Sequence, residues 1–222
     1  MSDNKSLEFQ DKYDAAHSLE YFHKHNRGLR RKVSNWVEQR MLARALRKAG
    51  NPSSILDLPC GTGRFWALLA RRADRRLMAG DYSQSMIDTA RRFRAPQIAG
   101  RFECFQTSAF DIKQSDGIVE TIVCMRLLHH IGDPADRQKI LREFHRVASR
   151  SVIFSCWVEG NLQATRRKKL EKRREKRSYQ NRFVFEPARI EKEMKDAGFE
   201  ILGHVDMLPH VSMWRTYVLG KR

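Results

Sequence analysis

Two carboxylates and two glycines at a set spacing are the residues of this sequence best suited to chemistry. Asp57 ends an apolar run, and Gly61 and Gly63 stand just beyond it. Asp81 ends a second apolar run, 18 residues after Gly63. Glycines let the backbone approach a ligand closely, and a carboxylate at the end of the next strand can accept hydrogen bonds from both hydroxyls of a ribose. The spacing therefore predicts a site that holds a nucleoside.

Two adjacent histidines and an arginine follow another apolar run. Residues 117–125 form the run, and Arg126, His129 and His130 come soon after it. If the run is a strand of a parallel sheet, these residues lie at the edge where such sheets bind ligands. A histidine there can act as a general base, or it can pack and hydrogen-bond beneath the loop. Arg126 is expected to meet the cofactor or the substrate, or simply to leave the strand.

The elements that must position these residues alternate between strands and helices. Strands are predicted at residues 54–58, 77–81, 101–106, 117–125, 151–157, 199–205 and 214–219, and helices at 7–49, 64–73, 84–93, 134–147 and 187–197. Alternation of this kind predicts an α/β fold with a doubly wound, mostly parallel sheet of about seven strands, and the two final strands predict an antiparallel pairing near the end. Ser83 is a candidate N-cap for the helix at 84–93.

The composition is compatible with one domain and an appendage. The chain has 222 residues, and we expect an N-terminal helical cap at 1–50 and a main domain at 51–222 with a basic insertion at 159–185. The polar N-terminus and the lack of a long apolar stretch predict no signal peptide and no membrane span, hence a cytoplasmic location.

The four cysteines form no C-x-x-C pair, so reduced thiols are expected rather than disulfides or a metal site.

Positive charge is concentrated in the insertion. The formal net charge is +17, and residues 161–182 hold ten Lys and Arg against two Glu. Such charge favours acidic partners: nucleic acid, an anionic membrane surface, a phosphorylated glycan or an acidic protein. Arg166, Arg167, Lys168 and Lys169 are therefore candidate substrate contacts, with a solvated helix face as the alternative.

With these motifs in view, the sequence resembles the class I S-adenosylmethionine-dependent methyltransferases over roughly residues 54–220. Asp57, Gly61 and Gly63 match the first motif of that family, and Asp81 matches the acid after its second strand. The runs 127–131 (Leu-Leu-His-His-Ile) and 197–200 (Ala-Gly-Phe-Glu) are further similarities. A nicotinamide dinucleotide fold is the nearest alternative, but a third glycine is missing here.

The resemblance implies S-adenosyl-L-methionine as cofactor and assigns residues to it. The implied cofactor residues are Asp57, Pro59, Gly61, Gly63, Asp81, Tyr82, Met86, Ser108, Ala109, Phe110 and Met125. Two positions depart from the family pattern. Pro59 replaces a glycine and has no N–H to donate, and Ser108 stands where an acid often binds the adenine amine.

The resemblance also implies where the acceptor lies. His130 occupies a position that often faces the methyl group in this family and is the candidate catalytic base, with Arg126 and His129 near the substrate. Tyr13 and Tyr179 fall in segments that commonly form a lid over the substrate. The expected activity is methyl transfer to an anionic or acidic acceptor, with a protein lysine slightly favoured. RNA, a small molecule, a lipid or a glycan, or a binding role without catalysis, remain alternatives.

Overall fold

The structure is a computed structural model that describes residues 29–172 and 182–222. The predicted lid residues Tyr13 and Tyr179 lie outside the described residues, as does the part of the first predicted helix before residue 29.

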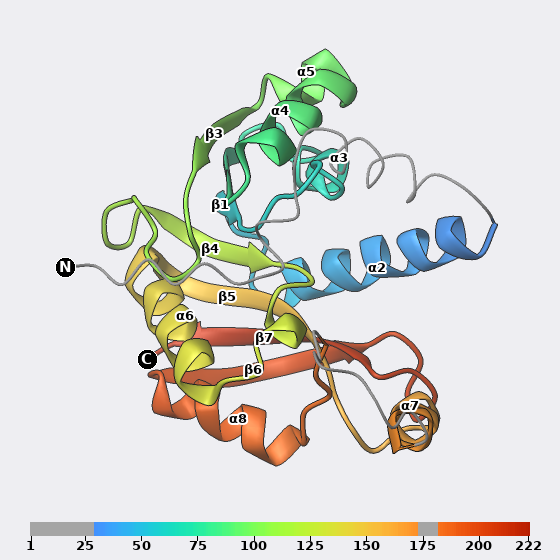
Figure 1. Cartoon of the computed structure of the whole chain (residues 1–222). Coiled ribbons are helices and arrows are strands. Elements are labelled where there is room, and N and C mark those ends of the chain that lie inside the picture. The colour runs from blue at the N-terminus through green and yellow to red at the C-terminus, as the bar shows by residue number, and fades with distance from the viewer. Residues whose placement is uncertain (1–28, 173–181) are drawn as a thin grey trace.

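The described elements follow the predicted alternation (Figure 1). The strands are β1 (Ser54–Asp57), β2 (Arg76–Asp81), β3 (Phe102–Gln106), β4 (Val119–Cys124), β5 (Ala148–Trp157), β6 (Phe199–Asp206) and β7 (Trp214–Lys221). The helices are α2 (Leu29–Lys48), α3 (Trp66–Leu69), α4 (Gln84–Phe93), α5 (Pro96–Ala99), α6 (Pro134–Val147), α7 (Leu162–Lys172) and α8 (Pro187–Asp196), with a 3₁₀ helix η1 (Leu128–His130).

The sheet confirms the predicted fold class. Its seven strands among the described residues run in the order β3-β2-β1-β4-β5-β7-β6. The first five are mutually parallel neighbours, and β7 pairs antiparallel with both β5 and β6. Since β1 lies between β2 and β4, the chain crosses in opposite directions on either side of it. Ligands of open α/β sheets bind beyond the carboxyl ends of the strands at such a point.

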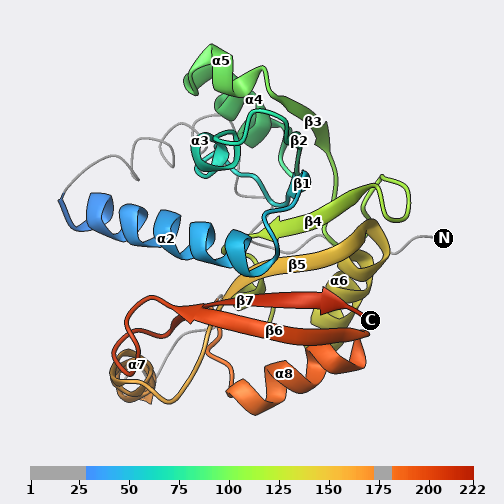
Figure 2. The ribbon, with the colours of Figure 1, turned by 180° about the vertical axis from the view of Figure 1, so that it is seen from behind.

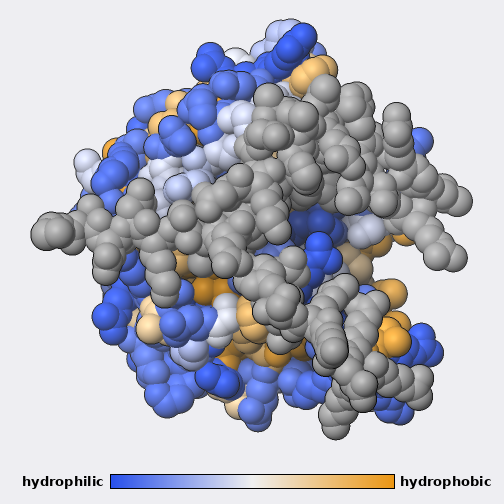
Figure 3. Space-filling model, viewed as in Figure 1, coloured by the Kyte–Doolittle hydropathy of each residue, from blue (hydrophilic) through white to orange (hydrophobic). Residues whose placement is uncertain are grey.

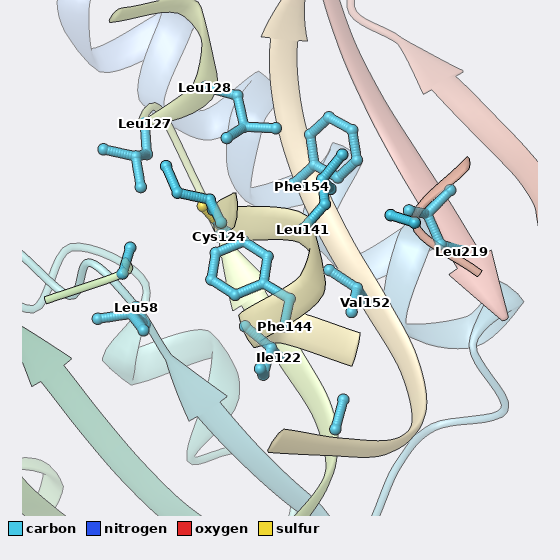
Figure 4. Packing of buried hydrophobic residues seen from close by; sticks show 14 of the residues in the cluster. Leu58, Ile122, Cys124, Leu127, Leu128, Leu141, Phe144, Val152, Phe154 and Leu219 are labelled. Atoms are coloured by element: carbon cyan, nitrogen blue, oxygen red, sulfur yellow. The ribbon is translucent and has the colours of Figure 1, made fainter. Parts of the chain in front are cut away.

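Helices cover both faces of the sheet, as the opposed views in Figures 1 and 2 show. On one face, α6 and α8 bury an apolar cluster that includes Ile122, Phe144, Phe154 and Tyr217. On the other, α2 packs with α3, α4 and α5 over a second cluster. Figure 4 shows the first cluster, with Phe144 of α6 lying close to side chains of β4 and β5. Continuous burial along β4 and β5 is typical of central parallel strands.

Some elements differ locally from the prediction. The helix predicted at 64–73 is shorter in the structure, where α3 has turns on both sides. Ser83 stands at the N-cap position of α4 but makes no side-chain cap hydrogen bond, and its hydroxyl lies 2.8 Å from Ser85 Oγ. Asp133, in contrast, caps α6 by accepting a hydrogen bond from the Ala135 N–H.

Removing the central aromatic of the first cluster tests this packing. Phe144 is fully buried on α6, so Phe144→Ala leaves a cavity that its neighbours cannot fill. We expect the free energy of unfolding to fall by about 3–5 kcal/mol in urea denaturation. The control Val33→Ala alters an exposed position and should stay within about 0.5 kcal/mol of the wild type. A loss below about 1 kcal/mol for Phe144→Ala would contradict this packing.

Candidate active site

The turn after β1 is shaped by two glycines with distinct physical requirements. Both have a positive φ, +52° at Gly61 and +66° at Gly63, which favours glycine. A Cβ added at Gly63 would lie only 2.8 Å from the Trp66 ring, so Gly63 also serves the packing of α3 against the turn. At Gly61 an added Cβ would meet no atom of the described residues within 4 Å. Within this part of the chain, open space therefore adjoins the turn at Gly61.

Asp81, at the end of β2, is joined to this turn by hydrogen bonds. Its carboxylate accepts the Gly61 N–H at 2.8 Å and the Ser83 N–H at 3.0 Å. Burial raises its pKa to about 6, although these backbone hydrogen bonds and one from Tyr82 favour the charged form. A carboxylate has lone pairs for about four hydrogen bonds, so acceptor capacity remains.

Asp57, at the end of β1, is a buried carboxylate with the Trp66 indole nearby. Neither of its oxygens makes a hydrogen bond of normal geometry within the described part of the chain. Burial, followed by the nearby charge of Asp81, raises the pKa of Asp57 well above its ordinary value, and the Trp66 indole opposes this shift. An unpaired buried polar group is costly, which makes this carboxyl group available to a donor supplied by a ligand. Pro59 follows in the same turn, after a cis peptide bond from Leu58.

The other predicted cofactor residues fall into two groups. Tyr82 is half-buried and Met86 is buried, both just beyond Asp81. Ala109, Phe110 and Met125 have side chains that belong to the apolar clusters of the core. These three residues can therefore offer a ligand mainly their backbone groups.

Ser108 uses its hydroxyl within its own turn. Its Oγ accepts a hydrogen bond from the Phe110 N–H at 3.2 Å. The hydroxyl thus holds the loop after β3 rather than standing in for an acid.

A buried carboxylate on α2 joins three separate parts of the site. Glu38 is only 2% exposed, and its oxygens lie 2.6 and 3.0 Å from the guanidinium nitrogens of Arg126. Arg64, next to the glycine turn, lies 2.9 Å from the same carboxylate and also donates to Asn35 Oδ1 of α2. Burial alone would raise the pKa of Glu38, but the charges of Arg126 and Arg64 outweigh it and lower the pKa below its ordinary value. Helix α2, the glycine turn and the end of β4 are thereby held together.

Arg126 has the unusual backbone that functional positions can show. Its φ is +68°, and its N–H donates to Ser155 Oγ of β5. Its guanidinium carbon lies 4.8 Å from the centre of the Trp214 ring. Arg126 therefore lies beyond the carboxyl end of β4 and is held there by Glu38 and Trp214, and its predicted contact with the cofactor or the substrate stays a prediction.

His129 is buried in a cluster of aromatic side chains. Its ring stacks on Trp157 at 4.6 Å and meets Trp214 edge-on at 5.2 Å, while His130 is 4.3 Å away. Burial, and then the charges of His130 and Arg126, lower the pKa of His129 well below its usual range. His129 is therefore neutral near pH 7, and its Nδ1 has no partner among the described residues. His130 is half-buried beside it.

The basic insertion is anchored to this cluster by α7. The Asn161 side chain caps the helix by accepting the Ala164 N–H, and the buried Ala164 packs with Trp157 and Met213. Arg167 lies 4.8 Å above the Trp157 ring and pairs with Glu171. The first part of the insertion is thus held against the site.

The remaining predicted cations of α7 are exposed. Lys168 pairs with Glu159, whereas Arg166 and Lys169 face solvent. Of the four predicted cations of α7, Arg167 alone has a ring contact with the aromatic cluster among the described residues. In Figure 3, hydrophilic and apolar residues both reach the surface near α7.

Two site residues were missed from the sequence. Glu38 is the only acid in the highly basic α2, and a lone acid among cations on an amphipathic helix could have marked it. Trp157, the last residue of β5, carried no motif, and its place became evident only when β5 and β7 were paired.

A methyltransferase domain model matches residues 55–151, the segment that holds Asp57, both glycines, Asp81 and Arg126. Residues 55–151 therefore form a methyltransferase domain, and the chain has the fold of solved S-adenosylmethionine-dependent methyltransferases. No helix among the described residues of this methyltransferase is long and apolar enough to cross a membrane.

Solved structures share the fold of this methyltransferase. Magnesium protoporphyrin IX methyltransferase from Synechocystis PCC 6803, with bound S-adenosylhomocysteine, has 17% identity and a TM-score of 0.75, over 96% of this chain and 98% of that one. A SAM-dependent methyltransferase from Methanosarcina mazei has 19% identity and a TM-score of 0.59, over 76% and 92%. The [4+2]-cyclase SpnF has 14% identity and a TM-score of 0.64, over 82% and 81%. Their identities are low, so the likeness concerns the fold.

The ion pairs of Glu38 with Arg126 and Arg64, which we call the Glu38 clamp, give a stability prediction. A carboxyl group whose folded pKa is depressed adds stability above its ordinary pKa of 4.5, and this stability is lost as the pH falls through the folded pKa. Glu38→Gln should lower the free energy of unfolding by about 3 kcal/mol at pH 7. The difference from wild type should shrink as the pH falls below about 4.5.

Urea denaturation between pH 3 and 7 measures both effects. The matched control is Glu103→Gln, whose carboxylate forms an exposed pair with Arg76 at 3.7 Å and should change stability by less than about 1 kcal/mol. Equal losses for the two variants, or a Glu38→Gln loss independent of pH, would contradict the clamp.

Proposed function

We propose that this enzyme methylates an acceptor that carries negative charge, and that a lysine side chain on an acidic protein surface is the first candidate. The observation that carries the proposal is the cationic, aromatic cluster at the carboxyl edge of the sheet. There the guanidinium groups of Arg126 and Arg167 lie over the rings of Trp214 and Trp157.

The turn after β1 suits S-adenosylmethionine. Gly61 adjoins open space, and Asp81 retains acceptor capacity for the two ribose hydroxyls. The unpaired carboxyl group of Asp57 suits a donor from the ligand, such as the ammonium group of its methionine part. Tyr82 and Met86, just beyond Asp81, would flank the adenosine, with backbone groups of Ser108 and Ala109 nearby. These residues together fit the cofactor.

When bound, the cofactor supplies a methyl group on a sulfonium centre for an in-line displacement. The chain's own residues have to hold the acceptor in line and exclude water. Glu38 fixes Arg126 at the mouth of the site, and the buried rings of Trp157 and His129 close one side. His130, half-buried next to this wall, is the candidate base for a protonated nucleophile.

Positive charge at the mouth favours a lysine acceptor in two ways. Exposed Arg166 and Lys169 would attract an acidic protein surface. Nearby guanidinium groups lower the pKa of an amine, because like charges disfavour its protonated form. Arg126 and Arg167 would therefore raise the fraction of neutral, nucleophilic amine.

A small planar acceptor with a carboxylate is the second candidate. Trp157 and Trp214 offer aromatic surface, and the arginines next to them suit an anionic group. The Synechocystis enzyme, whose title names magnesium protoporphyrin IX, aligns over nearly the whole of this chain. RNA, lipid and glycan acceptors lack a comparable observation.

The raised pKa of Asp81 gives a prediction for cofactor binding. Ribose hydroxyls donate to the ionised carboxylate, so affinity for S-adenosylmethionine should fall as the pH falls through about 6. Asp81→Asn should weaken binding at pH 7 by about 1.5–3 kcal/mol and reduce the pH dependence between pH 5 and 7. Calorimetry measures both, with the exposed Asp88→Asn of α4 as the matched control. Unchanged affinity in Asp81→Asn would reject the assignment.

Transfer of labelled methyl groups tests the acceptor. An extract from cells lacking this enzyme is incubated with the purified protein and labelled S-adenosylmethionine, then separated into protein, RNA, lipid and small-molecule fractions. We expect label in protein, recovered as methyl-lysine after hydrolysis. Label in the small-molecule fraction would favour the second candidate, and label in RNA, lipid or glycan would reject both.

The role of α7 is tested in the same assay. Replacing Arg166, Arg167, Lys168 and Lys169 by glutamine should leave cofactor affinity unchanged and lower transfer to the acceptor at least tenfold. The control removes four cations from α6 and α8: Lys139, Arg142, Lys192 and Lys195. Equal activity of the two variants would show that α7 is only a solvated surface.

A further inference from the structure

The outer face of α2 carries an aromatic side chain in a row of arginines. Trp36, Arg40, Arg44 and Arg47 follow one another at spacings of four, four and three residues, which places them on one side of the helix. All four are exposed, and Trp36 has 56% of its surface accessible. The opposite side of α2 holds the buried residues Leu42, Ala45 and Leu46. Figure 2 shows α2 lying across one face of the sheet.

No ion pair among the described residues neutralises the cations of this face. Among the described residues, no ion pair involves Arg40, Arg44, Arg47 or Lys48. Glu38, the one acid of α2, is buried and pairs with Arg64 and Arg126. Cations in the last turn stabilise a helix through its dipole, which accounts for Arg47 and Lys48. The dipole does not account for an exposed tryptophan about three turns earlier.

The exposed ring of Trp36 already stacks with one cationic side chain. The guanidinium carbon of Arg40 lies 4.1 Å from the centre of its ring, so one face is occupied by a cation and more than half of the side chain is still accessible. Exposed aromatic rings with arginines around them are the usual platform for unpaired bases. An acidic protein surface would use the cations but would gain little from the ring.

A hollow continues the row at the end of the helix. It has a volume of about 460 Å³ between α2 and β6 and is lined by Arg44, Arg47, Lys48, His204 and Val205. The row from Trp36 to Arg47 extends about 16 Å along the helix axis. That length corresponds to roughly five stacked nucleotides at about 3.4 Å each.

We propose that the outer face of α2, made of Trp36, Arg40, Arg44, Arg47, Lys48 and His204, binds single-stranded nucleic acid. A base stacks on Trp36, and the phosphates that follow lie along the arginines and in the hollow. This surface is distinct from the mouth at Arg126 and Arg167, and the inference does not depend on which acceptor is methylated.

Binding of a labelled 20-nucleotide single-stranded RNA of mixed sequence tests the proposal. Fluorescence anisotropy with the full chain is followed at several salt concentrations, without S-adenosylmethionine. Trp36→Ala should weaken binding about 5- to 100-fold and leave the salt dependence unchanged, since stacking releases no counterions. Arg44→Gln with Arg47→Gln should weaken binding and reduce the slope of log K against log salt by about 1.4, at about 0.7 for each lost phosphate contact.

The matched control is Lys139→Gln with Arg142→Gln, which removes two exposed cations from α6 on the other face of the sheet. It should retain nearly wild-type affinity and slope. Equal effects of the two double variants, or no effect of Trp36→Ala, would overturn the proposal. Poly-glutamate that competes as well as RNA and is indifferent to Trp36 would assign this face to an acidic protein instead.

Discussion

The buried carboxylate of Glu38 is the interaction on which the geometry of the site depends. It holds Arg126 at the end of β4 and Arg64 beside the glycine turn, and it belongs to a helix that packs on β6 and β7. Neither arginine could be held at low exposure without an anion, because an unpaired buried charge is far costlier than a paired one. One carboxylate therefore fixes the position of α2 relative to both the glycine turn and the end of β4.

Around this clamp the site divides into two electrostatic halves. The cofactor half is acidic, with Asp57 and Asp81 buried so deeply that both have raised pKa values. The half that we propose for the acceptor is cationic and aromatic, with Arg126 and Arg167 over tryptophan rings and a neutral His129 behind them. The acidic half therefore attracts positively charged groups, and the cationic half attracts negatively charged groups.

Most of the fold could be predicted from the sequence, because its signals are local. The apolar runs, the proline and aspartate at the start of α6, and the glycine after α8 each predict structure from nearby residues. Elements that depend on packing were missed or misjudged. The helix predicted at 64–73 is only α3, and α7 forms within a segment too polar to predict a packed helix.

The sequence by itself determined the fold class, the glycine turn and the two carboxylates, since strand, turn and acid are encoded at fixed local spacing. Only the tertiary structure decided how the acceptor side is built. Glu38 meets Arg126 across 88 residues of chain, and Trp157 meets Trp214 through the antiparallel pairing of β5 with β7. Contacts between residues so far apart leave no periodic pattern, because the pairing depends on which strands become neighbours rather than on the residues beside them.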